Sequence, residues 1–258
     1  LEEVADTILA AISIAYDLDF SHEDIFEMID EKSQVWQSRQ AAEDDANFPI
    51  PFEIHVTVEK GEDVDNDVFA SKFKAACESI GVKPIVLDLS NNSGDKMKDA
   101  MTSSNCYGDN RKAYEEMQEI SGKLKRLGYT VIREKVETAP WHPGAPKKQG
   151  DLMPKNCYFE SHIGVLISDS EDDREELQAL AVRVDAHLSK NTFKKVEDGK
   201  YIVMLTLRDY HISREEFLLK VEKALTELKS EGWVMPKKEV VEFAIYDTKI
   251  SHDNLWLK

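Results

Sequence analysis

The feature that most constrains the fold of this 258-residue chain is an internal repeat. The segment "FEIHVTV" (52–58) is matched by "FESHIGV" (159–165), with Phe, Glu, His and Val at equivalent places. Further along, "LKRLGYTVIREKV" (124–136) is matched in the same order by "LKSEGWVMPKKEV" (228–240). Two matches in the same order indicate duplication, because each repeat must then build the same structural unit.

The spacing of apolar residues predicts the same succession of elements in each half. Alternation typical of strands occurs at 52–59, 83–90 and 129–137, and again at 158–167, 200–207 and 238–247. Helical spacing occurs at 66–80, 111–127, 172–189 and 213–231. The polar stretch 91–110 and the Pro/Gly-rich stretch 138–156 are predicted loops.

These elements predict an α+β fold made of two duplicated strand–helix–strand–helix–strand lobes related by a pseudo-two-fold axis. Helices cover one face of each sheet, so the other faces are expected to meet across a cleft. An N-terminal helical hairpin precedes the lobes, with Ser21 as a helix cap. The expected domains are 1–46 for the helical segment, 47–150 for the first lobe and 151–258 for the second.

Charge and cysteine content limit the partners and the compartment. The formal net charge of −17 disfavours binding to a long nucleic-acid duplex, which usually requires an excess of Lys and Arg. The sequence contains no apolar run that could span a membrane. Three scattered cysteines, Cys77, Cys106 and Cys157, suggest a reducing compartment. We expect a cytoplasmic protein whose partner is a small nucleotide or a short RNA end.

Each repeat begins with a strand whose non-core face carries a histidine. Side chains at i, i+2 and i+4 share a face, so Glu53, His55 and Thr57 point together. The corresponding face of the second strand carries Tyr158, Glu160, His162 and Gly164. Two imidazoles facing one cleft suit general acid–base catalysis, in which one accepts a proton and the other donates one.

The two histidine strands resemble the two-histidine (2H) phosphoesterases over roughly residues 50–250. That family is bilobal and carries a His-hydrophobic-Thr/Ser-hydrophobic motif in each lobe. "HVTV" (55–58) matches the motif, whereas "HIGV" (162–165) departs from it at Gly164. The resemblance implies hydrolysis of 2′,3′-cyclic or 2′–5′ phosphodiesters such as RNA ends. It also implies catalysis by His55 and His162 with Thr57 at the phosphate, and no cofactor.

Further residues are candidates for substrate binding. Arg133 and Lys135 share a face of the third strand, where a cation would stabilise phosphate charge. Tyr158 lies on the same strand face as His162, and Gly164 stands where the family has a hydroxyl. Trp141, in the connection between the halves, could stack on a base.

Two other functions are compatible with the same residues. Glu53, His55, Glu160 and His162 form a His₂Glu₂ set whose atoms suit Zn²⁺, Fe²⁺ or Mn²⁺. The chain would then be a metal-dependent enzyme of the glyoxalase or dioxygenase type. Alternatively, the missing hydroxyl at Gly164 favours a non-catalytic nucleotide-binding module.

The N-terminal segment resembles the C-terminal part of MazG-like nucleotide pyrophosphohydrolases. Glu3 and Asp6 match that family's Glu-x-x-Asp helix, and Lys32 and Arg39 match its later basic motif, with Trp36 in place of Asn. The upstream Glu-rich helix that completes the family's metal site is absent from the sequence. We therefore expect this hairpin to serve packing or oligomerisation.

Overall fold

The computed structural model describes residues 21, 49–61, 65–90, 96–168, 170–191, 200–236 and 239–253. The chain divides into two compact units, Leu1–Phe48 and Pro49–Lys258. Every described helix and strand belongs to the second unit. The hairpin expected within residues 1–46, and with it the MazG-like motif, lies outside the described residues apart from Ser21.

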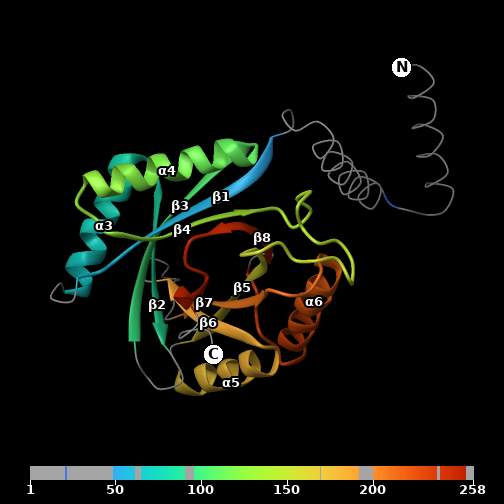
Figure 1. Ribbon diagram of the computed structural model, residues 1–258. Helices are drawn as coiled ribbons and strands as arrows, with labels where there is room; N and C mark the ends of the chain where they lie inside the picture. Colours follow the sequence, from blue (N-terminus) through green and yellow to red (C-terminus); the bar gives the residue numbers. More distant parts are fainter. Residues whose placement is uncertain are drawn as a thin grey trace, which may run out of the picture. The chain divides into compact units, whose positions relative to one another are not determined.

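Eight strands form one closed antiparallel barrel (Figure 1). Around the barrel the order is β1-β3-β2-β6-β7-β5-β8-β4. The strands are β1 (Ile50–Val58), β2 (Lys83–Ser90), β3 (Lys96–Gly108), β4 (Val131–Thr138), β5 (Tyr158–Ser168), β6 (Ala186–Asn191), β7 (Lys200–Asp209) and β8 (Val240–Asp247). Closure leaves none of these eight strands with an unpaired edge.

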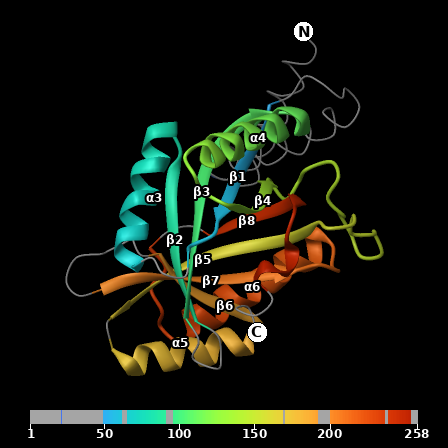
Figure 2. The same ribbon diagram turned by 60° about the vertical axis from the view of Figure 1, so that its left-hand side comes forward.

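Helices cover the outside of the barrel. They are α3 (Asn66–Ile80), α4 (Asn110–Arg126), α5 (Glu171–Arg183) and α6 (Arg214–Ser230), followed by the short 3₁₀ helix η1 (Ile250–Asp253). In both views α3 and α4 lie on one side of the barrel and α5 and α6 on the other (Figures 1 and 2). None of the described helices has the length and apolar character needed to span a membrane.

The prediction of two lobes facing each other across a cleft is wrong. The first half contributes the run β4-β1-β3-β2 and the second half the run β6-β7-β5-β8. The two runs join edge to edge through the β2–β6 and β4–β8 pairings. The polar strand faces therefore point into a single barrel, and no cleft separates two sheets.

The error arose from two strands that the sequence pattern did not reveal. Strand β3 lies within the stretch 91–110 that was predicted to be a loop, because its residues are mostly polar or small. Strand β6 lies at the end of the predicted helix 172–189. With these strands, each half has four strands in the order βαββαβ.

Alternation along β1 separates the helix-covered core from the barrel interior. Phe52, Ile54 and Val56 are fully buried on the outward face, while Glu53 and His55 lie on the inward face. The second half repeats this arrangement, with a core beneath α5 and α6 built around Phe159, Ile163, Val165, Leu177 and Phe217. The apolar faces of the strands thus meet the helices, which leaves the interior to polar side chains.

Helix α6 begins with a capping box that offers a test of local stability. The Ser213 hydroxyl accepts a hydrogen bond from the Glu216 amide, and the Glu216 carboxylate accepts one from the Ser213 amide. Replacing Ser213 with alanine should lower the free energy of unfolding by about 1 kcal/mol in urea titrations. The exposed Ser79, near the end of α3, supplies a Ser→Ala control that should stay within about 0.5 kcal/mol. Equal losses in both variants would contradict the capping role.

Candidate functional site

The barrel encloses a cavity of about 190 Å³, called the chamber below. Side chains from all eight strands line it, among them Glu53 and His55 of β1, Lys135 and Glu137 of β4, and Glu160 and His162 of β5. An eight-stranded barrel has an interior that side chains can fill or that can hold one small ligand. The two repeat histidines therefore share one cavity, inside the barrel.

The carboxylates around His55 favour its charged form. Its Nδ1 lies 2.9 Å from the Thr102 carbonyl oxygen, which can only accept, so Nδ1 carries a proton. Its Nε2 lies 3.2 Å from Glu137 Oε2 and 3.5 Å from Glu53 Oε1. Burial alone would lower the pKa of His55, but the Glu137 and Glu53 carboxylates outweigh it and raise the pKa. His55 is therefore suited to donate a proton.

His162 has the opposite preference. Its Nδ1 lies 2.9 Å from the Thr206 hydroxyl, while its Nε2 is 3.9 Å from Glu160 Oε2. Burial lowers the pKa of His162, and the Glu160 and Glu137 charges oppose this only in part. The Thr206 hydroxyl can accept from Nδ1–H, and in that tautomer the lone pair resides on Nε2. His162 is therefore suited to accept a proton.

A buried ion network links the two halves of the barrel. Lys135 Nζ lies 2.6 Å from Glu137 Oε1 and also contacts Glu160 Oε2. Arg208 Nη2 lies 2.6 Å from the other oxygen of Glu160. Burial would lower the pKa of Lys135, but Glu137 and Glu160 raise it. Burial would raise the pKa of Glu160, but Arg208 and Lys135 hold it well below its usual value.

Arg133 and Tyr158 form a second buried group. Arg133 makes a bidentate contact with Asp247, at 3.0 Å through Nε and 2.6 Å through Nη2. The Tyr158 hydroxyl donates to Asp247 at 2.8 Å and accepts from Arg133 at 3.2 Å. The guanidinium proposed for substrate binding is thus engaged by a carboxylate of β8. Tyr158 is fully buried and does not line the chamber.

Glu242 of β8 differs from the other charged chamber residues because it has no partner of opposite charge in the part of the chain that the structure describes. Only 9% of its surface is exposed, and its side chain makes no hydrogen bond or ion pair with any described residue. Burial, followed by the charges of Glu137 and Glu53, raises the pKa of Glu242 to about 9. Ionising a carboxyl group here is costly, because burial reduces its contact with water and the neighbouring carboxylates repel its charge.

The predicted site residues fall into two groups. Those that line the chamber are Glu53, His55, Thr57, Arg133, Lys135, Glu160 and His162. Those outside it are Trp141, Tyr158 and Gly164; a Cβ at Gly164 would lie 3.3 Å from Ile202 Cγ2. The chamber is also lined by Glu137, Arg208 and Glu242, which the sequence pattern did not single out. Alternation from Lys135 places Glu137 on the same strand face and could have revealed it.

The alternative His₂Glu₂ metal site does not fit the geometry. Within the described residues, no three His, Cys, Asp or Glu side chains are placed to hold one metal ion. Glu160 is already bound by Lys135 and Arg208, so its oxygens serve two protein cations. A metal at this position would have to displace both cations.

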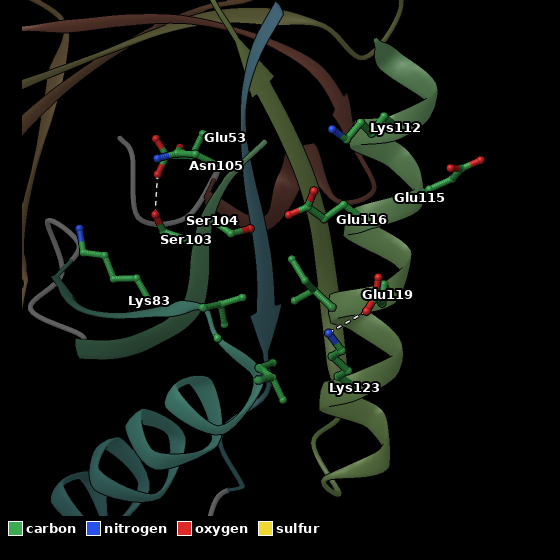
Figure 3. A pocket seen from close by; sticks show the side chains of 14 residues that line it. Glu53, Lys83, Ser103, Ser104, Asn105, Lys112, Glu115, Glu116, Glu119 and Lys123 are labelled. Carbon is green, nitrogen blue, oxygen red and sulfur yellow. Dashed lines mark hydrogen bonds and ion pairs between the residues drawn. The ribbon is translucent and has the colours of Figure 1, made fainter. Parts of the chain in front are cut away.

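An outer groove of about 870 Å³ adjoins the chamber at Glu53 (Figure 3). Charged and polar side chains of β3 and α4 line it, and Glu53, which accepts a hydrogen bond from Ser103 at 2.7 Å, lines both cavities. The Glu53 side chain retains 31% of its exposure. Glu53 therefore lies where the chamber meets the surface.

Comparisons with known proteins assign no family. No protein-family model matches the chain, and no curated protein matches it. A structure of the acetolactate synthase small subunit from Thermotoga maritima is similar, at 13% identity, 77% coverage of this chain, 96% of that chain and a TM-score of 0.28. A structure of the regulatory subunit of aspartate kinase from Thermus thermophilus is similar at 10% identity and a TM-score of 0.29, with 70% of this chain and 97% of that chain covered. Scores this low support neither a fold family nor a function.

Proposed function

We propose that the protein is an enzyme that performs general acid–base chemistry on a small molecule in the chamber. The observation that carries the proposal is that His55 and His162 line one cavity and have pKa values shifted in opposite directions. When their environments shift the pKa values of two titratable groups in opposite directions, one group is suited to act as the acid and the other as the base. The same residue type thus has two roles, set by its neighbours.

The contacts suggest a role for each histidine. His162 Nε2 accepts a proton from the attacking water or hydroxyl, while Nδ1–H stays bonded to Thr206. His55 Nε2–H donates to the leaving atom, and Thr102 holds the ring by its other nitrogen. Lys135 remains protonated between Glu137 and Glu160, and it holds these two carboxylates in place beside the histidines.

The chamber limits the size of the substrate. A volume of about 190 Å³ is the space that roughly six molecules occupy in liquid water. A small molecule fits this space, or one end of a larger molecule that extends past Glu53 into the groove. A whole nucleotide exceeds it, since ligand pockets for molecules of that size are typically about 300 Å³ or more.

Phosphodiester hydrolysis is a second, more specific candidate. Thr57 lies beside His55 in the chamber lining, as the 2H motif requires, and a 2′,3′-cyclic or 2′–5′ phosphodiester end could meet both histidines. The carboxylates around His55 oppose it, because they repel a phosphate. A non-catalytic nucleotide-binding module would need the same phosphate contact.

The compartment is part of the proposal. Cys77, Cys106 and Cys157 are free thiols, and burial raises the pKa of each. Thiols in this state are unreactive and consistent with a reducing environment. We infer a cytoplasmic location.

Histidine substitutions and pH profiles test the proposal. His55→Gln and His162→Gln should each lower kcat/KM at least about 100-fold, because each removes one proton-transfer group. The assay panel comprises 2′,3′-cyclic nucleotides, 2′–5′ dinucleotides, and small esters and amides. The exposed His211 supplies a matched His→Gln control with unchanged activity. Activity should fall at low pH, where His162 protonates, and at high pH, where His55 loses its proton.

Histidine NMR provides a readout that requires no substrate. The His55 pKa should titrate above the ordinary value of about 6.5 and the His162 pKa below it. Reversed or equal values would remove the acid and base assignments. If the parent hydrolyses other substrates but none of the phosphodiesters, only the phosphodiesterase candidate fails.

A further inference from the structure

The chamber contains more carboxylates than cations. Within the described residues, the carboxyl groups that line it are Glu53, Asp99, Glu137, Glu160 and Glu242. The cationic side chains are Arg133, Lys135 and Arg208, joined by His55 when its ring is protonated. Each cation already lies against at least one carboxylate. Asp99 in turn faces His252 at 3.0 Å. Among these carboxyl groups, Glu242 is the one that forms no ion pair with a described residue.

Glu242 marks the part of the chamber that lacks a partner. It is nine-tenths buried, lines the chamber and contacts no donor among the described residues. Its strand register places it opposite Glu160, whose two oxygens are taken by Lys135 and Arg208. Neither cation is therefore left to satisfy Glu242, whose oxygens have room for a donor from a ligand.

We propose that Glu242, with Glu53 and Glu137 beside it, binds the ammonium group of a small amine in the chamber. An ammonium has three N–H donors and no acceptor, which suits a site formed by carboxylate oxygens. That this amine is the molecule on which His55 and His162 act rests on the proposed function; the binding site itself does not.

The position of the site also fits a small ammonium ion. Glu53 lines both the chamber and the outer groove, so a cation arriving from the surface meets a carboxylate first (Figure 3). The ion then moves toward Glu137 and Glu242. A phosphate on the same path would meet these carboxylates as like charges, which disfavours it. The groove itself carries Lys83, Lys112 and Lys123 beside its acids, so selection for positive charge begins at Glu53.

Binding should be coupled to the release of a proton. Burial and the charges of Glu137, Glu53 and Glu160 hold the proton on Glu242, while Lys135 opposes them. An ammonium ion supplies the missing positive charge, so the Glu242 proton leaves to solvent as the ion binds. No covalent bond forms or breaks in this step. Near pH 7.5 about one proton should be released for each ammonium bound.

Calorimetry with defined ammonium salts tests the inference. Methylammonium and ethanolamine are titrated into the full chain at pH 7.5 and constant ionic strength, in two buffers of different ionisation enthalpy. We expect saturable binding, proton release in the parent, and at least a tenfold loss of affinity in Glu242→Gln. The exposed Glu222 on α6 supplies a Glu→Gln control with parental affinity. Sodium chloride and inorganic phosphate serve as ligand controls.

The outcomes separate this inference from the proposed function. Absent ammonium binding, parental affinity in Glu242→Gln, or saturable binding of phosphate in place of ammonium would each overturn it, whatever the histidine pKa values are. If ammonium binding depends on Glu242 but the pKa of His55 is not above that of His162, only the proposed function fails. If Glu242→Gln fails to fold, proton release in the parent decides, since binding without release contradicts a site at Glu242.

Discussion

Replacing Lys135 with methionine is expected to lower the free energy of unfolding by about 3–5 kcal/mol. The Lys135 ammonium lies between Glu137 and Glu160, and all three side chains are buried. Methionine fills a similar volume but leaves two carboxylates in the barrel without their shared cation. Arg208 and His55 compensate for the lost charge only in part, because Arg208 already pairs with Glu160 and His55 with Glu137.

Urea unfolding at pH 8 measures this loss, with a surface lysine as the control. Lys123 pairs with Glu119 on α4 at 2.7 Å, and the Glu119 side chain is largely exposed. Lys123→Met should change stability by no more than about 0.5 kcal/mol. The loss in Lys135→Met should shrink as pH falls, because Glu137 and Glu160 can then take up protons. Similar effects in the two variants would contradict a stabilising role for the buried ion network.

The strand faces could be predicted from sequence because alternation is a local property. Glu53, His55 and Thr57 could be assigned to one face from their spacing alone, and they line the chamber. The closure of the barrel could not be predicted in this way. It depends on β2 meeting β6 and β4 meeting β8, pairings between residues far apart in the sequence.

The two missed strands have identifiable physical causes. Strand β3, "KMKDAMTSSNCYG", shows no apolar alternation, because its inward face meets a polar chamber and its outward face is made of small residues. Strand β6 begins after a sharp turn at Asp185, whose φ of 54° ends the local helix. Asp is among the residues that tolerate this conformation but also occurs within helices, so the residue type alone did not indicate that the helix ends here.

Most of the candidate site arises from contacts between strands. His55 could be singled out by its repeat, but its charge state depends on Glu137 of a neighbouring strand. Arg133 was expected at a phosphate, yet its partner Asp247 comes from the far end of the chain. The local sequence around Glu242 does not distinguish it from a surface glutamate, because its burial follows from the closure of the barrel. Pairings of this kind lie beyond single-strand periodicity.

Glu242→Gln is expected to raise the free energy of unfolding at pH 8 by up to about 5 kcal/mol. In the folded chain the Glu242 pKa is about 9, so the side chain keeps its proton at pH 8. In the unfolded chain its pKa is near the ordinary value of about 4.3, so the proton is lost. Folding at pH 8 must therefore take up a proton, which costs free energy that a neutral glutamine does not require.

The pH dependence distinguishes this cause from better packing. The raised pKa means that Glu242 favours folding most at low pH, and this contribution is lost progressively as pH rises from about 4 toward 9. The advantage of Glu242→Gln over the parent should therefore be small near pH 5 and grow with pH. Glu222→Gln, on the exposed face of α6, should show no such trend. A constant advantage at both pH values would indicate that Glu242 is not held protonated, because packing differences do not vary with the ionisation of this carboxyl.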